Sequence, residues 1–166
     1  MNRRSIYAAS FDPITKGHLW IIEQGMQLFE ELIVAVGTNR QKTYTFSLED
    51  RYRMVEESVS KYANVTVESY ENLFLVDFAK ANRVKYLLRG IRSETDYEYE
   101  RTIRHVNSDL DAAIVPIFLI PPREIAEVSS SVVKSLVGPK GWEKVIKKYV
   151  PASVHEMLVE RYGKER

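Results

Sequence analysis

The stretch IYAASFDPITKGHLWII, residues 6–22, decides how the fold is interpreted. It begins with a short apolar run, Ile6 to Ala9, which is typical of a buried strand. A Ser-Phe-Asp-Pro corner follows, and Gly17-His18 then opens a segment with apolar residues at helical spacing. Strand, corner and helix start form a common phosphate site, because a helix N-terminus presents unpaired N–H groups and a partial positive charge.

The composition of the chain is that of an ordinary globular domain. At 166 residues, with 45% hydrophobic and 28% charged residues, the chain is long enough for one domain with a core. A formal net charge of +1 gives no reason to expect a nucleic-acid or membrane partner. The absence of cysteine excludes disulfides and thiolate metal sites. No apolar run reaches the roughly 18 residues of a membrane span, and no signal-peptide core is present, so we expect a cytoplasmic protein.

Strand-like and helix-like segments alternate along the chain. Apolar or alternating runs predict strands at residues 6–9, 31–38, 64–70, 84–88 and 112–120. Helical spacing and capping residues predict helices at residues 17–29, 47–61, 74–81, 95–109 and 129–137. This order favours an α/β, Rossmann-like, doubly wound five-stranded parallel sheet with helices on both faces. We expect a single domain over residues 1–166, with a helical C-terminal extension from about residue 138.

Unusual polar chemistry follows four of the predicted strands. Residues 10–18 follow the first strand, and GTNRQK (37–42) ends the second. RGIR (89–92) follows the fourth strand, and EVSSS (127–131) follows the fifth. In open parallel sheets, ligands bind beyond the carboxyl ends of the strands. Basic and hydroxyl groups from these segments therefore converge on one edge, where they suit a polyanion.

Three segments resemble the nucleotidyltransferase superfamily with the (H/T)xGH signature: SFDPITKGH (10–18), LLRGIRSETDYEYE (87–100) and EVSSSVVK (127–134). The RGIR and DYEYE block is similar, more closely, to bacterial phosphopantetheine adenylyltransferases, and the resemblance covers residues 7 to about 158. It implies attack by the phosphate of 4'-phosphopantetheine on the α-phosphorus of ATP, giving dephospho-coenzyme A and pyrophosphate without a covalent enzyme intermediate. Catalysis would consist of positioning and electrostatic stabilisation.

The resemblance also implies roles for residues of the first strand exits. His18 would stabilise the transition state and contact ATP, while the Ser10 hydroxyl bridges the reacting phosphates and the Phe11 backbone reaches the nucleotide. Lys42 and Arg89 would hold the attacking phosphate, and Lys42 is also counted as catalytic. The alternative for Lys42 is a plain surface lysine, and Arg40 is then the fallback. Leu75 would contact the pantetheine arm, or else belong to the core.

Further implied roles concern ATP. Gly90, Ile91 and Arg92 match a nucleotide-binding turn, with Arg92 on the ATP phosphates and counted as catalytic. Glu100 matches a carboxylate on the nucleotide side. The triple serine would hold the β- and γ-phosphates, with helix capping as the alternative for one hydroxyl. The ATP-binding residues assigned in this last loop are Ile125, Ala126, Glu127, Val128, Ser129, Ser130 and Ser131.

Some residues depart from the family pattern. Ala8-Ala9 replaces the usual Pro-Gly, and Ile125 stands where an aromatic residue often lies near the adenine. The alternatives are a nicotinate or nicotinamide mononucleotide adenylyltransferase, a cytidylyltransferase, and a non-catalytic nucleotide sensor. Mg²⁺ is expected to arrive with the ATP phosphates, because no acidic cluster forms a metal cage. The resemblance implies a homo-oligomer, a hexamer, with small-molecule substrates only.

Overall fold

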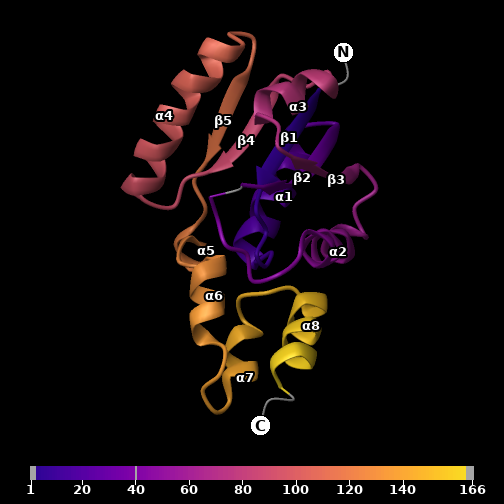
Figure 1. Cartoon of the computed structure of the whole chain (residues 1–166), viewed down its shortest axis with the longest axis vertical. Coiled ribbons are helices and arrows are strands. Elements are labelled where there is room, and N and C mark those ends of the chain that lie inside the picture. Colours follow the sequence, from indigo (N-terminus) through magenta and orange to yellow (C-terminus); the bar gives the residue numbers. More distant parts are fainter. Residues whose placement is uncertain (1–2, 40, 164–166) are drawn as a thin grey trace.

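The computed structural model describes residues 3–39 and 41–163, and its elements are labelled in Figure 1. Five parallel strands form one sheet in the order β3-β2-β1-β4-β5. They are β1 (Arg4–Ala9), β2 (Glu31–Thr38), β3 (Val65–Glu71), β4 (Tyr86–Gly90) and β5 (Val115–Leu119). The predicted α/β class with a doubly wound parallel sheet is confirmed. The strand order reverses at β1, so a ligand is expected at the carboxyl ends of β1 and its neighbours.

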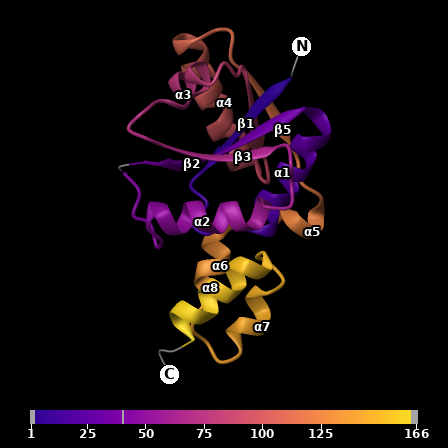
Figure 2. The ribbon, with the colours of Figure 1, turned by 90° about the vertical axis from the view of Figure 1, so that its right-hand side faces the viewer.

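Helices connect the strands and follow the last one. The connecting helices are α1 (Lys16–Leu28), α2 (Leu48–Val59), α3 (Leu75–Ala81) and α4 (Glu94–Leu110). After β5 come α5 (Arg123–Ala126), α6 (Ser130–Leu136), α7 (Trp142–Ile146) and α8 (Ala152–Tyr162). Figure 2 shows α3 and α4 on one side of the sheet, with α1 and α2 on the other. Helices therefore cover both faces.

The strands contribute side chains to two apolar cores, because successive side chains of a strand point to opposite faces. On one face Tyr7, Val34 and Leu88 pack with apolar residues of α1 and α2. On the other face Ile6, Ile33 and Leu87 pack with residues of α3. The unbroken apolar run of β2 is explained by this burial on both faces, which is usual for a central parallel strand.

The C-terminal helices share the core of the α1 and α2 face. Trp142, Ile146 and Leu158 are buried in the same cluster as the sheet residues. The backbone N–H of Lys16, at the start of α1, donates to the carbonyl of Tyr149 (2.8 Å). Figures 1 and 2 show α6, α7 and α8 together at the end of the molecule where the described chain finishes. The extension from about residue 138 is thus packed against the sheet domain.

Most element boundaries lie within two residues of the sequence-based ones, and two differences are larger. β5 begins at Val115, because the backbone at Asp111 turns: its carboxylate accepts from the N–H of Ala113, and its carbonyl from the N–H of Ile114. The single-turn helix α5 was not predicted, since the two prolines before it indicate a loop. In the described part of the chain, no helix combines the length and the hydrophobicity needed to cross a membrane.

We predict that Leu158→Ala lowers the stability of the whole protein. Leu158 is 1% exposed, so its truncation should lower the free energy of unfolding by about 2–5 kcal/mol in a single cooperative transition. Leu28→Ala is the matched control, because Leu28 is 45% exposed and should change this free energy by no more than about 0.5 kcal/mol. Urea titration at a fixed protein concentration measures both. A separate early transition in which only the C-terminal helices unfold would contradict the shared core.

Candidate active site

The corner between β1 and α1 is held by the carboxylate of Asp12. Its Oδ1 accepts from the backbone N–H of Phe46 (2.9 Å), and its Oδ2 accepts from that of Thr45 (3.0 Å). The ammonium of Lys134, on α6, lies 2.8 Å from Oδ2. Burial opposes ionisation of Asp12, but the hydrogen bonds from Lys134, Thr45 and Phe46 outweigh it and lower the pKa of this carboxyl. One side chain therefore joins the corner to the loop before α2 and to α6.

The start of α1 fixes the tautomer of His18. Its Nδ1 lies 3.0 Å from the backbone nitrogen of Thr15, the N-cap residue, and accepts a hydrogen bond from that N–H. The ring proton is therefore on Nε2, which remains a donor. Desolvation by the surrounding protein and the positive charge of Arg92 lower the pKa of His18 to about 4. At neutral pH, His18 is an uncharged hydrogen-bond donor.

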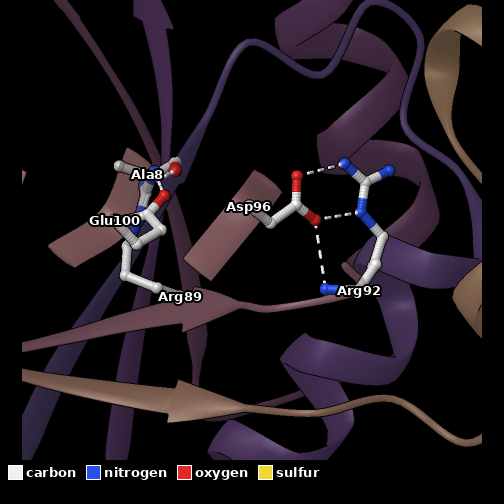
Figure 3. Close-up of polar contacts among 5 residues, drawn as sticks. All are labelled: Ala8, Arg89, Arg92, Asp96 and Glu100. Carbon is white, nitrogen blue, oxygen red and sulfur yellow. Dashed lines mark hydrogen bonds and ion pairs between the residues drawn. The ribbon is translucent and has the colours of Figure 1, made fainter. Parts of the chain in front are cut away.

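Arg89, at the end of β4, is held in a bidentate ion pair with Glu100 (Figure 3). Its Nε donates to Oε2 of Glu100 (2.8 Å), Nη2 donates to Oε1, and Nη1 donates to the carbonyl of Ala8 (2.8 Å). Glu100 is the buried residue of α4, 6% exposed. Three of the five guanidinium N–H groups are used in these bonds, so two remain for a ligand. The pair orients Arg89, and the residual donors suit a phosphate.

Arg92 is held in a similar way at the start of α4. Its backbone N–H and its Nε both donate to Oδ2 of Asp96 (3.0 and 2.9 Å), as Figure 3 shows. Asp96 lies in the first turn of the helix, where a carboxylate is favoured by the helix dipole. Ser93 caps the same turn by accepting from the Asp96 N–H (3.2 Å). The RGIR turn thus presents two oriented guanidinium groups.

Two of the three serines before and at the start of α6 already have protein partners. Ser129 is the N-cap and accepts from the N–H of Val132 (3.2 Å), while the Ser130 hydroxyl donates to the carbonyl of Pro13 (2.8 Å). Ser131 is exposed and lines a cavity at the carboxyl edge of the sheet. The second of these bonds ties α6 to the corner after β1, which explains why the serines lie at the site.

One cavity of about 830 Å³ brings most of the sequence-predicted residues together at the carboxyl edge of the sheet. Phe11, Ile91, Ala126 and Glu127 do not line it, and Phe11 and Ile91 are buried. Arg40 lies outside the described residues. The predicted residues that line the cavity are Ser10, His18, Lys42, Leu75, Arg89, Gly90, Arg92, Glu100, Ile125, Val128, Ser129, Ser130 and Ser131.

The cavity also contains residues that sequence reasoning missed. Thr15, inside the TKGH signature, orients His18, so its position before Gly-His was an available signal. Tyr7 and Tyr99 also line the cavity: Tyr99 lies inside the DYEYE block, which was an available signal, whereas Tyr7 lies in the apolar strand run, which gave none. Gly17 has a packing role as well: a Cβ there would lie 2.9 Å from the carbonyl oxygen of Val128. Close packing of α1 against the last loop therefore requires glycine.

Comparison with known proteins first gives the class. A family model described as Cytidylyltransferase-like matches residues 6–136, which makes the chain a nucleotidyltransferase. The Plasmodium falciparum nicotinic acid mononucleotide adenylyltransferase complexed with NaAD superposes with a TM-score of 0.69 at 16% identity, covering 99% of this chain and 97% of that one. At this identity the likeness shows the fold alone.

Curated relatives then narrow the class. The phosphopantetheine adenylyltransferase of Chromobacterium violaceum is 49% identical over 163 residues, 98% of this chain and 99% of that protein. That of Neisseria meningitidis serogroup B is also 49% identical, over 98% of this chain and 96% of that protein. The one from Clostridium perfringens is 38% identical over 99% of this chain and 98% of its own length. The chain belongs to the phosphopantetheine adenylyltransferase family, and the resemblance found in the sequence is confirmed.

We predict that His18 titrates far below an ordinary histidine in the protein without ligand. Its Cε1 proton resonance, assigned with His18→Ala, should move with a midpoint of about 4 instead of 6.5. Because the unfolded chain then binds the proton more tightly than the folded one, His18 should reduce stability as pH falls from 6.5 towards 4. The free energy of unfolding of His18→Ala should therefore fall less steeply over this range. A midpoint near 6.5 would contradict the neutral donor.

We predict that Arg89 and Glu100 act as one unit. Glu100→Ala leaves a largely enclosed guanidinium without its carboxylate, so Arg89 should lose its orientation as well as its partner. In a double-mutant cycle, the kcat/KM of the double variant should lie within about twofold of that of Arg89→Ala alone. Glu98→Ala, an exposed carboxylate on the same helix, is the control and should leave kcat/KM unchanged. Fully additive losses would show that the two residues act separately.

Proposed function

We propose that this protein transfers the adenylyl group of ATP to 4'-phosphopantetheine, giving dephospho-coenzyme A and pyrophosphate. The observation that carries the proposal is the 49% identity, over nearly the whole length of both chains, to curated phosphopantetheine adenylyltransferases. The cavity at the sheet edge supports it, because cationic, hydroxyl and imidazole donors line a space large enough for a nucleotide. The fold likeness to a nicotinic acid mononucleotide enzyme, at 16% identity, does not favour that other acceptor.

The chemistry proposed is an in-line displacement without a covalent enzyme intermediate. An oxygen of the acceptor phosphate forms a bond to the α-phosphorus of ATP, and the bond from that phosphorus to the bridging oxygen breaks as pyrophosphate leaves. The protein then has to orient two polyanions and stabilise charge on the phosphoryl oxygens. No described residue has to become an attacking nucleophile.

The roles proposed for individual residues follow from the hydrogen-bond donors that line the cavity. His18 Nε2–H is proposed to donate to the reacting phosphoryl group, since its Nδ1 is already engaged by Thr15. The residual donors of Arg89, together with Lys42 and Ser10, are proposed to hold the acceptor phosphate. Arg92 and Ser131 are proposed to meet the ATP phosphates. Arg89 and Arg92 need little reorganisation, because carboxylates already fix their guanidinium planes.

Mg²⁺ is proposed to enter with ATP. Among the described residues, no group of three or more histidine, aspartate and glutamate side chains could hold a metal ion. The two carboxylates that line the cavity, Asp96 and Glu100, are each engaged by an arginine. Oxygens of the triphosphate and water therefore suit this hard cation better than the protein does, and the ion would neutralise charge on the phosphates.

We also propose a cytoplasmic homo-oligomer, a hexamer by family resemblance. Large apolar side chains are exposed on α4 and beside β5, where a monomer would leave them in water. The absence of cysteine supports a reducing compartment. The exposed residues on α4 and around β5 are Tyr97, Tyr99, Val106, Leu110, Val115 and Ile120.

The test offers the protein ATP or CTP with each of three acceptors: 4'-phosphopantetheine, nicotinate mononucleotide and nicotinamide mononucleotide. We predict pyrophosphate release with ATP and 4'-phosphopantetheine when Mg²⁺ is present, and a loss of kcat by a factor of about 10² or more in His18→Ala. Circular dichroism controls for the fold of this variant. Release with a mononucleotide acceptor instead would establish the other adenylyltransferase activity. ATP binding without release from any acceptor would establish a nucleotide sensor.

A further inference from the structure

Arg51, on α2, is a buried arginine that joins the ends of two strands below the cavity. It is 1% exposed and does not line the cavity itself. Its Nη1 donates to the carbonyls of Ser10 (2.6 Å) and Gly37 (3.0 Å), and its Nη2 donates to Oγ1 of Thr38 (3.1 Å). The ring of Tyr44 covers the guanidinium at 4.1 Å. The carboxyl ends of β1 and β2 are therefore fixed by one side chain.

The charge of Arg51 is not neutralised by a direct ion pair. In residues 3–39 and 41–163, no carboxylate lies within ion-pair distance of it, and its buried Nε has no hydrogen-bond partner. Burial lowers the pKa of Arg51, while the adjacent Tyr44 and the charges of Asp12 and Glu71 oppose this shift. A buried cation without its counter-ion is costly, and the cost falls when an anion binds nearby. The cavity above Ser10 is where such an anion would bind.

The bond to Ser10 also orients the next amide. In a trans peptide the carbonyl and the following N–H point in opposite directions, so a Ser10 carbonyl aimed at Arg51 turns the Phe11 N–H away from it. Phe11 has a φ of 50°, a left-handed conformation that is strained for a side chain of this size. Within the described chain, the Phe11 N–H has no hydrogen-bond acceptor. Arg51 thus keeps the Phe11 amide on the side of the peptide that faces away from the guanidinium, next to Ser10, which lines the cavity.

We propose that Arg51 is a positioning residue of the adenylyl-transfer site, which fixes the Ser10–Phe11 peptide for phosphate binding and supplies positive charge beneath it. The effect expected on pyrophosphate release rests on the proposed function. The effect expected on ATP affinity does not depend on which acceptor the protein uses. Arg51 itself does not touch the substrate. It acts through the backbone of β1 and through the field that it adds to a poorly solvated region.

The test compares Arg51→Gln and Arg51→Lys with Arg53→Gln. Arg53, also on α2, is exposed and pairs loosely with Asp50 (3.7 Å), so its variant is the control for lost surface charge. ATP affinity is measured by calorimetry, kcat and KM by pyrophosphate release, and the free energy of unfolding by urea. We expect Arg51→Gln to weaken ATP binding about tenfold and to lower kcat/KM by about 10²-fold, since a small misplacement at the reacting centre has such effects. Arg53→Gln should stay within about twofold of the parent in all measurements.

Charge and hydrogen bonding are separated with Arg51→Ala and two small planar molecules of similar shape. Guanidinium carries the missing charge and donors, whereas urea carries donors alone. At concentrations far below those that unfold the protein, guanidinium should restore ATP binding to Arg51→Ala and urea should not. Equal restoration by both would overturn the electrostatic part of the proposal.

Other outcomes also decide the matter. Normal ATP affinity and kcat/KM in folded Arg51→Gln or Arg51→Lys would overturn it, even if stability fell, because Arg51 would then be structural only. The proposal would also be overturned if none of the Arg51 variants folded, even with guanidinium present, because Arg51 would then be needed for the fold and not for the site. If the parent protein bound ATP but released no pyrophosphate, the proposed function would fail, and calorimetry would still test Arg51.

Discussion

The corner between β1 and α1 is the constraint on which the site depends. A parallel strand must end and a helix must begin within six residues, 10–15, while both stay packed on the sheet. The backbone there leaves the ordinary regions, with Phe11 at a positive φ. Asp12 accepts two backbone N–H groups from residues 45 and 46 and pairs with Lys134 of α6. The corner therefore has its shape only because distant segments hold it.

This dependence explains why the site is built from many segments and still has a fixed geometry. A donor contributes to phosphoryl transfer only if it already points to the place where charge develops. Here Thr15 orients His18, Glu100 orients Arg89 and Asp96 orients Arg92. For the two arginines a carboxylate acceptor occupies part of the guanidinium donors, whereas for His18 a backbone donor occupies Nδ1 and leaves Nε2–H free. The two arginines are therefore oriented but keep fewer free donors, while His18 is oriented and keeps its donor.

The sequence predicted the strands and helices well, because β1 and β2 carry unbroken apolar runs and α2 carries a Ser47 cap that the structure contains. It also predicted which segments meet, because the carboxyl ends of parallel strands share an edge. It could not predict that Glu100 binds Arg89, or that Ser130 binds the corner. These contacts depend on how a helix or loop packs against the rest of the fold. Neither hydrophobic periodicity nor a single motif indicates that packing.

The electrostatics of the cavity follow from the same arrangement. Arg89 and Arg92 are largely neutralised by their carboxylates, and His18 is uncharged, so none of the three adds much net charge. Lys42 and Arg51 carry charge without an ion pair in the described chain. Recognition of a polyanion must then come mainly from oriented donors in a poorly solvated space, where each hydrogen bond to a charged oxygen is strong. This explains how a chain with a net charge of only +1 can present a site suited to highly charged ligands.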